Sequence, residues 1–517
     1  MTLINPVSRR SFLKTSAAAG AAGALGTGLA TPALADGHLP DPASVLADIS
    51  VNKYVREDYR TLYNMSGEPL WDPNKDWIRT VDWEAVRSEL AGTTVRFAIG
   101  AADQESAAEG LVPFEALSGI KVELVPIPDD SFYDKALAEF ISGNASFDAL
   151  QFFSPWLGDF AAPGFLAPLD DFAAKWGLPL DDFYETYSAN YGFFNGQMFG
   201  IPFDCDIQMV HVRKGYMEQI LGGPVDIVNS VPSYDELIRI SGELNQIEPG
   251  VAGVGMMAAR GFWSTYTWEH IAAQAGMMLF DENWEPIFNG DAGMKGMDTI
   301  MALTANANEG HAGAGWPENR AAWLGGQLAT NISWQDSGTQ AMRPDQSQIV
   351  DDFVTIYEPR IDGGRFAPPN IAGSTSCVSA SAQNAEGAFL MLAFLTTASI
   401  MAMNEANANG VAPGYRSVLT NPELQSVSQP AKVWSDSLDH AWCAPRLPGM
   451  FNMEQAIGNE INRAVVGQIS GKEALDNAAA AVRKIMDQNG FYGSTPPVEY
   501  AAAAPGLYVG EGKPLPF

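Results

Sequence analysis

Four segments of the sequence place aromatic rings beside acids, amides or an arginine in predicted loops. These segments are residues 152–159, 200–206, 259–268 and 331–336. An aromatic ring covers the flat CH face of a sugar, and Asp, Asn, Gln and Arg side chains hydrogen-bond its hydroxyls. Because ligands of α/β proteins usually bind in loops at strand ends, the pattern predicts a site for a hydroxylated small molecule.

The sequence alone also allows these residues to have structural roles rather than to bind a ligand. A tryptophan taken singly packs in a core or on the surface more often than it contacts a ligand. Asp204 and Asp206, taken singly, are equally typical of solvated loop charges or helix caps. The aromatic and acidic residues therefore define a candidate site only as a group.

The short motifs of common enzyme classes are missing from the sequence. It contains no GxSxG elbow, no GxxxxGK[ST] phosphate loop and no GxGxxG fingerprint after the first predicted strand. The five histidines are scattered without an HExxH pattern, so neither a protein-built metal site nor a cofactor is predicted. Carboxylates are abundant, so a hydrolase that uses Asp204 or Asp206 with a second acid stays open.

The chain is strongly acidic, with a formal net charge of −31 over 517 residues. Such a surface repels nucleic acid and anionic membranes, so no nucleic-acid partner is expected. The length suits two or three domains, each with its own core. Cys205, Cys377 and Cys443 form no CxxC pair, so one disulfide plus a free thiol and no disulfide at all both stay open.

The N-terminus has the parts of a removable export signal. Two arginines come first, an uncharged Ala/Gly-rich stretch follows from residue 15 to 34, and a small-x-small site ends at Ala35. The stretch SRRSFLK, residues 8–14, resembles the twin-arginine export signal of bacteria. We therefore expect residues 1–35 to be a signal peptide, cleaved near Ala35 and Asp36. The resemblance implies that the twin-arginine translocase carries the folded chain to the periplasm.

Alternating strands and helices are expected to position the candidate loops. The expected elements are strands at 94–100, 120–125 and 147–153, with helices at 105–117 and 131–142 between them. Ser131 with Asp134 fits a capping box, and Gly143 fits a helix end. This order is typical of βαβ units, so we predict an α/β fold with a mostly parallel sheet.

The segments outside this region are also expected to be ordered. Residues 36–92 contain several tryptophans, which are rare in segments that cannot bury surface, so an extension packed on the body is predicted. Further helices are predicted at 233–244 and 385–396. Two helices are expected near the C-terminus, one with an apolar stripe over 453–465 and one at 474–486 behind a Ser470–Glu473 capping box.

Short segments along the chain resemble, in order, the motifs of one family. The segments are 118–125, 142–153, 164–172, 196–202, 231–237, 325–334 and 473–485. For example, GFLAPLDDF at 164–172 resembles the family's G-x-L-x-P-L-D loop, and GQMFGIP at 196–202 resembles G-x-x-Y-G-x-P. The chain is thereby similar to the extracellular solute-binding proteins of bacterial ABC importers, specifically the carbohydrate-binding family 1 that includes maltose-binding protein.

This resemblance implies a two-lobed periplasmic-binding-protein fold of type II, with the ligand cleft between two α/β lobes. The implied organisation is lobe 1 from 93–205 plus 371–490, lobe 2 from 206–370, and a C-terminal tail at 491–517. It also implies where the solute binds, since Trp334 matches the family's ring-stacking tryptophan and Phe153 and Trp156 match its aromatic position. The ligand-binding residues expected on this basis are Gln104, Glu105, Phe153, Trp156, Asp204, Asp206, Arg260, Trp263, Trp268, Trp334 and Asp336.

The resemblance further implies a protein that binds without catalysis. Its partners would be a sugar or polyol and the permease subunits of an ABC transporter in the inner membrane. Two alternatives stay open. One is the periplasmic carbohydrate hydrolase, and the other is the same fold with a non-sugar solute such as an amino compound, a polyamine or an osmolyte.

Overall fold

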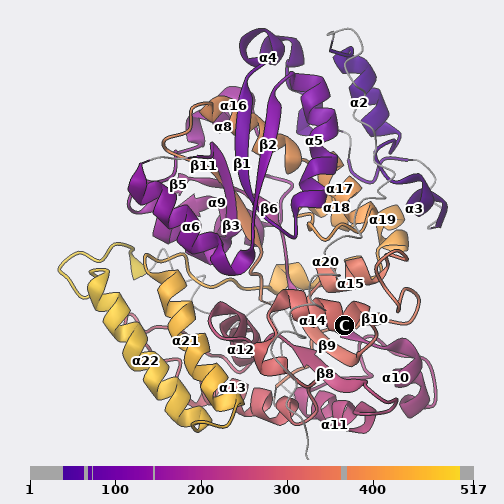
Figure 1. The fold of residues 1–517 in the computed structure, drawn as a ribbon, viewed down its shortest axis with the longest axis vertical. Helices are drawn as coiled ribbons and strands as arrows, with labels where there is room; N and C mark the ends of the chain where they lie inside the picture. Colours follow the sequence, from indigo (N-terminus) through magenta and orange to yellow (C-terminus); the bar gives the residue numbers. More distant parts are fainter. Residues whose placement is uncertain (1–38, 63–67, 73, 144–145, 362–369, 501–517) are drawn as a thin grey trace, which may run out of the picture. The chain divides into compact units, whose positions relative to one another are not determined.

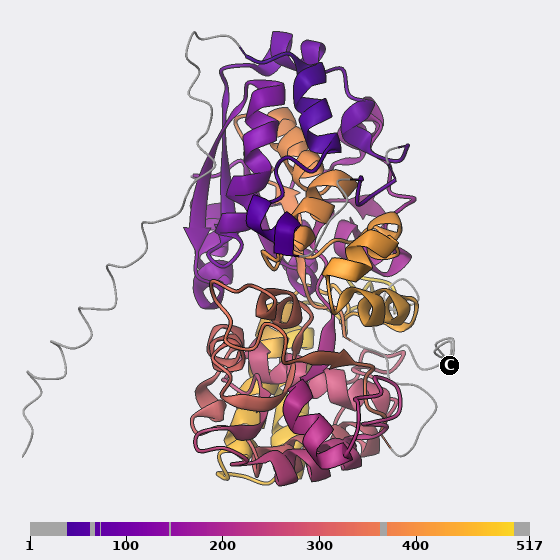
Figure 2. The ribbon, with the colours of Figure 1, turned by 90° about the vertical axis from the view of Figure 1, so that its right-hand side faces the viewer.

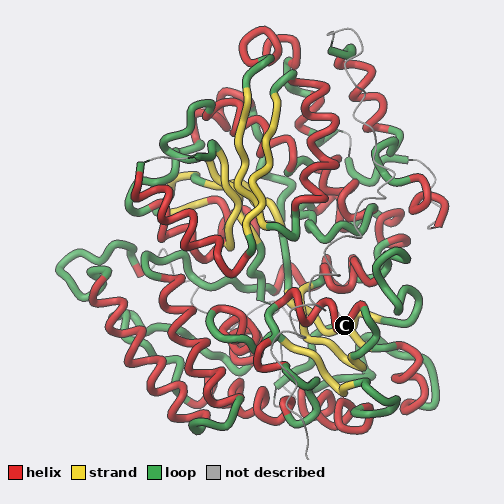
Figure 3. Tube along the Cα trace, viewed as in Figure 1, coloured by secondary structure: helices red, strands yellow, loops and turns green. Residues whose placement is uncertain are grey.

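In the described part of the chain, nine of the eleven strands form two separate sheets, seen in yellow in Figure 3, and the other two form a short hairpin. The computed structural model describes residues 39–62, 68–72, 74–143, 146–361 and 370–500. The expected signal peptide, residues 1–35, and most of the expected tail therefore lie outside the described residues. The residues from Asp41 onward belong to one compact unit, and both sheets lie within it.

The first sheet has five strands in the order β2-β1-β3-β11-β6. The strands are β1 Thr94–Gly100, β2 Lys121–Ile127, β3 Ala149–Phe153, β6 Gly200–Asp204 and β11 Ser374–Val378. β1 runs parallel to β2 and β3, whereas β11 runs antiparallel to β3 and β6. The three predicted strands are confirmed as β1, β2 and β3, each shifted by no more than two residues at either end.

The first lobe comprises this sheet and the helices around it. Its helices are α5 Gln104–Ser118, α6 Asp129–Ser142, α7 Leu157–Ala161, α8 Asp170–Trp176, α9 Glu185–Gly192, α16 Ala385–Leu395 and α17 Ala398–Ala406. Short additions are the 3-10 turn η2 Ser154–Trp156 and the hairpin β4 Phe193–Phe194 with β5 Gln197–Met198. α16 contacts β1, β3, β6, β11 and α5, and every residue from Gly387 to Leu395 is buried, so this apolar helix forms the centre of the lobe's core.

The second sheet has four strands in the order β10-β7-β9-β8. They are β7 Gln208–Val212, β8 Ala252–Met256, β9 Leu328–Trp334 and β10 Val354–Ile356. The second lobe comprises this sheet and its helices, α10 Lys214–Leu221, α11 Tyr234–Leu244, α12 Phe262–Gln274, α13 Asp291–Thr304, α14 Trp316–Leu324 and α15 Asp336–Ala341, with the turn η3 His311–Gly313. α11 confirms the predicted helix, and the Ser233 hydroxyl caps it by accepting a hydrogen bond from Glu236 N at 3.2 Å.

The chain passes between the sheets where β6 ends and β7 begins. Only Cys205, Asp206 and Ile207 separate the two strands. Gly373, just before β11, lies against this crossover, and a Cβ on it would stand 2.0 Å from the Asp204 carbonyl oxygen. Two backbone segments therefore run in direct contact between the lobes, and only glycine allows that approach.

The C-terminal helices, α21 Met450–Val465 and α22 Gly471–Gln488, pack beside the second lobe. α21 contacts α12 and α13, and α22 contacts α13, as the yellow helices of Figure 1 show. A Cβ on Gly458 would lie 1.7 Å from the Gly261 carbonyl oxygen, so the absence of a side chain sets this helix contact. The range 371–490, expected as one part of lobe 1, thus contacts both lobes: α16 covers the first sheet, α21 and α22 lie on second-lobe helices, and α21 also contacts η2 and α7 of the first lobe.

Between α17 and α21 the chain forms short helices. They are α18 Arg416–Leu419, α19 Pro422–Val427, α20 Ala431–Ser437 and the turn η4 Leu438–His440. In the described part of the chain, no single helix is long and apolar enough to cross a membrane, and only the bent pair α16 with α17 meets the length and composition required.

The described part of the N-terminal extension packs on the first lobe. It contains α2 Pro42–Ser50, α3 Glu57–Leu62, η1 Trp77–Arg79 and α4 Trp83–Leu90. α2 and α4 both contact α5, and the extension's tryptophans are buried at Trp71, Trp77 and Trp83. Figures 1 and 2 show the indigo helices beside the orange segment that contains α16 and α17.

Two local predictions for helix ends have different outcomes. α6 begins at Asp129 rather than Ser131, with Pro128 at its N-cap, so the Ser131 capping box is wrong. Ser131 instead donates its hydroxyl to the Pro128 carbonyl oxygen at 3.1 Å. Gly143 ends the helix with φ 67°, as predicted. The Ser470 cap is also confirmed, since its hydroxyl accepts a hydrogen bond from Glu473 N at 3.1 Å.

Candidate functional site

A cavity of roughly 520 Å³, including its solvent-open part, lies between the two lobes. Its lining combines aromatic rings with acidic side chains. The lining residues are Gly100, Ala102, Asp103, Asp129, Phe132, Gln151, Phe152, Phe153, Trp156, Asp204, Asp206, Trp263, Trp316, Trp334, Asp336 and Ser374. We call this space the interlobe cavity.

The first lobe supplies its side chains from strand ends. Asp103 follows β1, Asp129 follows β2, Phe153 ends β3 and Asp204 ends β6. The carboxyl ends of parallel strands share one edge of a sheet, which brings residues far apart in sequence to one surface. These strands therefore bring residues at or just after their carboxyl ends to the cavity.

The second lobe supplies its side chains from one strand end and from helix starts. Trp334 ends β9 and Asp336 begins α15. Trp316 begins α14, and Trp263 lies in the first turn of α12. The crossover residue Asp206 completes the lining.

The aromatic rings meet across the lobe boundary. Phe153 of the first lobe and Trp334 of the second are nearly parallel, with ring centroids 6.1 Å apart and planes 24° from each other. Trp263 stands edge-on to both, at 6.0 Å from Phe153 and 5.8 Å from Trp334. Its indole Nε1 donates to Asp130 Oδ1 of the first lobe at 2.8 Å, which fixes this side of the boundary.

Four of the cavity's aspartates are held by hydrogen bonds. Asp103 accepts from Gln151 Nε2 at 2.5 Å, and Asp206 accepts from Gln335 Nε2 at 2.6 Å. Asp204 accepts from the Ala412 amide at 2.7 Å, and Asp336 accepts from Trp316 Nε1 at 3.3 Å. These contacts orient the carboxyl groups and are all to neutral donors.

Burial shifts the pKa of every aspartate in the lining upward. It raises the pKa of Asp103 to about 6 and the pKa values of Asp129 and Asp336 to about 7. The pKa values of Asp204 and Asp206 are also raised by burial, and then by repulsion from neighbouring carboxylates. The cause is that a carboxylate without water or a cation nearby loses solvation of its charged form.

The described residues of the lining include no lysine, arginine or histidine. The nearest guanidinium that acts on these carboxyl groups is Arg320, which lowers the pKa values of Asp103, Asp129 and Asp336 against the larger effect of burial. Arg320 lies over the Trp316 ring at 4.1 Å and donates to Gln340 Oε1 at 2.8 Å. It therefore belongs to the wall behind Trp316.

Most of the predicted site residues line the interlobe cavity. They are Phe153, Trp156, Asp204, Asp206, Trp263, Trp334 and Asp336. Two other predicted residues lie outside the cavity. Trp268 is fully buried in the second lobe, where its Nε1 donates a hydrogen bond to the Gly293 carbonyl oxygen at 3.0 Å. Arg260 is exposed, and its Nε donates to Asn462 Oδ1 at 3.4 Å.

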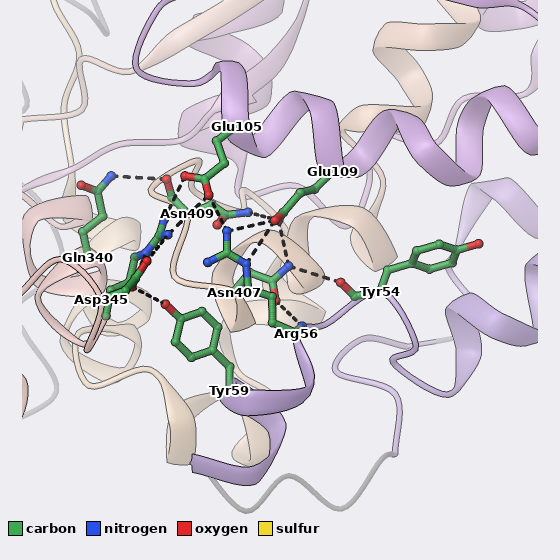
Figure 4. Close-up of polar contacts among 10 residues, drawn as sticks. Tyr54, Arg56, Tyr59, Glu105, Glu109, Gln340, Asp345, Asn407 and Asn409 are labelled. Atoms are coloured by element: carbon green, nitrogen blue, oxygen red, sulfur yellow. Dashed lines mark hydrogen bonds and ion pairs between the residues drawn. The ribbon is translucent and has the colours of Figure 1, made fainter. Parts of the chain in front are cut away.

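Gln104 and Glu105 line a second, more polar cavity beside the first. Arg320, Gln340, Arg343 and Asn409 also line it. Figure 4 shows the polar network at its rim, in which Glu105 faces Arg56 of the extension. Arg343 Nη1 lies 3.1 Å from Glu105 Oε2, and Arg56 of the extension also pairs with Glu105.

Several lining residues are absent from the sequence prediction. They include Asp103, Asp129, Gln151 and Trp316. A usable signal was present for the first two, because each acid follows a predicted strand within four residues. Gln151 lies inside β3, and only the structure shows that its amide reaches Asp103.

The described residues offer little for metal or redox chemistry. Within the described ranges no three His, Cys, Asp or Glu side chains are placed to hold a metal ion. Cys205, Cys377 and Cys443 are all free and buried, and burial raises the pKa of each thiol.

Two α/β lobes around a small, polar and aromatic cavity define a class, that of periplasmic solute-binding proteins. Residues 95–402 match the family described as "Bacterial extracellular solute-binding protein", and the chain belongs to this family. Residues 6–26 match the twin-arginine translocation pathway signal sequence. The predictions of family, fold, export signal and periplasmic location are therefore confirmed.

Relatives agree with the transporter class. A protein of Sinorhizobium fredii named as a probable amino-acid ABC transporter periplasmic-binding protein is 26% identical over 388 residues, which are 73% of this chain and 85% of that protein. The chain is thus a solute-binding protein of the ABC transporter type.

Solved structures share the fold. A solute-binding protein of Agrobacterium radiobacter in complex with ribitol is 21% identical, with a TM-score of 0.68 over 77% of this chain and 99% of that one. One from Agrobacterium vitis with bound D-mannitol is 20% identical, with a TM-score of 0.68 over 77% and 99%. The maltose-bound MalE3 of T. maritima is 19% identical, with a TM-score of 0.69 over 76% and 100%.

Proposed function

We propose that this protein captures a sugar or polyol in the interlobe cavity and delivers it, unchanged, to the permease of an ABC transporter. The observation that carries the proposal is the pairing of Phe153 and Trp334 across the lobe boundary, beside Asp103 and Asp336. Such rings cover the CH face of a sugar, and the carboxyl groups accept hydrogen bonds from its hydroxyls.

The walls of the cavity come from both lobes, which favours a small solute that residues of both lobes can contact at once. The related structures bound to ribitol and D-mannitol support the same range of ligands. A solute between the lobes should favour their closure, because only in the closed state do residues of both lobes contact it.

A free amino acid fits the lining less well, although the S. fredii relative carries that name. Its carboxylate requires a cationic side chain or several converging N–H groups. The described lining offers no basic side chain and five aspartates. The α-carboxylate of an amino acid would be repelled there.

The hydrolase is the second candidate, and the positions of two acids argue against its simplest form. A glycosidase pair must flank the sugar, with carboxyl groups roughly 5–10 Å apart. Asp204 and Asp206 instead both lie at the short crossover from β6 to β7, separated only by Cys205, so they do not stand on opposite walls of the cavity.

Equilibrium dialysis tests the proposed function. The purified chain from Asp36 onward would be dialysed against ribitol, D-mannitol, maltose, glucose, glucosamine and 1-amino-1-deoxysorbitol, and the bound fraction would be analysed by mass spectrometry. We expect one solute class to be retained with its mass unchanged. Retention of none of them, or recovery of cleaved maltose, would contradict the proposal.

A further inference from the structure

We propose that the solute is a hydroxylated molecule with a positive charge, an amino sugar or an amino polyol. This inference deepens the proposed function and rests on it. Three independent features of the interlobe cavity carry it: its acidic groups lack a basic partner in the lining, its rings surround the acids, and a buried indole donor has no acceptor.

The charge balance of the cavity is the first feature. Asp103, Asp129 and Asp336 line it together with Asp204 and Asp206, and no described lining residue is basic. Arg320, outside the lining, offsets the charge of Asp103, Asp129 and Asp336 only in part, so a neutral polyol would leave these groups either protonated or repelling one another. An ammonium group placed among them would offset that repulsion, since buried charges are stable when they are paired and hydrogen-bonded.

The second feature is the aromatic wall. Phe153, Trp156, Trp263 and Trp334 all line the cavity. The faces of such rings carry negative electrostatic potential and attract a cation within about 6 Å, with tryptophan the strongest. Aromatic faces and carboxylates in the same cavity are therefore complementary to one kind of group, a desolvated organic cation.

The third feature is a buried indole N–H group without an acceptor, and it indicates that the rest of the solute carries oxygen atoms. Trp334 is 2% exposed, and its Nε1 is buried with no hydrogen-bond partner. Buried donors are rarely left unsatisfied, so this N–H requires an acceptor. Protonated amines have no acceptor, whereas a hydroxyl or ring oxygen does. The solute therefore needs oxygen atoms as well as the amine.

Other cations agree less well with this cavity. The described residues place no three acid, histidine or cysteine side chains for a metal ion. Simple diamines and quaternary amines would pair with the aspartates but leave the Trp334 donor without an acceptor. The hydroxylated amine is the class that satisfies all three features.

Titration calorimetry with matched ligand pairs tests this inference. The pairs are glucosamine with glucose, and 1-amino-1-deoxysorbitol with sorbitol, measured at pH 7.5 and low salt. Putrescine and choline serve as cations without a polyol skeleton. We expect the amine of at least one pair to bind about tenfold or more tightly than its neutral partner, given a cation on both carboxylates and aromatic faces.

The other outcomes separate the two proposals. Neutral members that bind as tightly as their amines would overturn the charged solute and leave the sugar or polyol function intact. Putrescine or choline as the only binders would support a cationic site but overturn both the hydroxylated skeleton and the proposed function. Binding of none of the probes would count against both.

Two variants test whether the preference for the amine depends on the interlobe cavity. Asp129→Asn keeps the size of the side chain and removes its charge, so we expect the ratio of amine affinity to neutral-ligand affinity to fall to about threefold or less. Asp298→Asn, on the exposed surface of α13, is the matched control and should keep the full preference. Circular dichroism and the melting temperature confirm that both variants fold, and an unchanged preference in Asp129→Asn would overturn the inference.

Discussion

Arg343 and Glu105 form an ion pair that joins the two lobes, with Arg343 Nη1 3.1 Å from Glu105 Oε2. Arg343 follows α15 of the second lobe, and Glu105 lies in the first turn of α5 in the first. The Arg343 side chain is only 3% exposed, whereas Glu105 is half exposed. The extension makes a second contact with the second lobe, because the Tyr59 hydroxyl donates a hydrogen bond to Asp345 Oδ1 at 3.0 Å.

This ion pair should stabilise the closed state, and its loss should weaken solute binding. In Arg343→Met we expect affinity to fall about fivefold, the effect of losing about 1 kcal/mol from a partly exposed pair. The reason is that apparent affinity is reduced in proportion to the population of the closed form. Calorimetry gives the affinity, and small-angle X-ray scattering gives the change in radius on adding solute. Arg239→Met, which breaks exposed pairs on α11 alone, is the control and should change neither.

Trp334 and Trp268 should respond differently to substitution, although both were predicted to contact the solute. Trp334 lines the interlobe cavity, so Trp334→Ala should cost about 1–3 kcal/mol of binding free energy, the scale of one large buried side chain. Trp268 packs on Phe288 with centroids 5.6 Å apart, away from the cavity. Trp268→Phe should lower the melting temperature and leave affinity unchanged. Equal losses of affinity in both variants would contradict the assignment of the cavity as the site.

The raised pKa values of the cavity aspartates predict how stability changes with pH. In the solute-free folded protein, the Asp129 and Asp336 carboxyl groups keep their protons up to about pH 7, whereas unfolded aspartates lose theirs near pH 4. The folded state thus binds more protons between these values, and the contribution of these groups to the free energy of unfolding falls as pH rises.

Asp129→Asn should remove part of this fall in the free energy of unfolding. Relative to the original protein, we expect the variant to gain about 1–2 kcal/mol of unfolding free energy between pH 5 and pH 8, measured by urea denaturation without solute. A constant difference between the two proteins across this range would contradict the raised pKa. With a cationic solute the direction reverses, since deprotonated carboxyl groups attract it and its affinity should rise over the same range.

The extension should be an integral part of the first lobe. Trp83 is 3% exposed, packs edge-on to Phe394 of α16 at 5.9 Å and donates its Nε1 to the Ile78 carbonyl at 2.8 Å. Trp83→Ala should therefore destabilise the fold by about 3–5 kcal/mol, as for other buried aromatic truncations. The exposed Glu84→Ala on the same helix is the control. A loss below about 1 kcal/mol for Trp83→Ala would show that the extension is dispensable.

Much of the first lobe could be predicted from sequence because its strands and helices have local signatures. β1 alternates over its first residues and α16 is apolar from Gly387 to Leu395, so both follow from side-chain type alone. Which strands pair with each other does not follow from side-chain type. β11 enters the first sheet between β3 and β6 from more than 160 residues further along the chain, and only tertiary packing decides this pairing.

The limits of prediction at the site have the same physical origin. Every residue of α12 from Phe262 to Ala273 is buried, so no amphipathic pattern distinguishes Trp263, which faces the cavity, from Trp268, which faces the core. Glu105 was expected at the solute because it follows β1, yet two arginines from distant segments pair with it instead. Ion pairs of this kind depend on long-range contacts that spacing does not encode.

A thermal-shift screen of the chain from Asp36 onward, without and with sugars, polyols and their amino derivatives, tests the central claim most directly. A solute at 100 times its dissociation constant should stabilise the fold by about 2.7 kcal/mol, which raises the melting temperature measurably. We predict a selective shift with one class of hydroxylated solute, smaller in Trp334→Ala than in the original protein. A shift of equal size in both proteins, or none with any hydroxylated compound, would contradict the account.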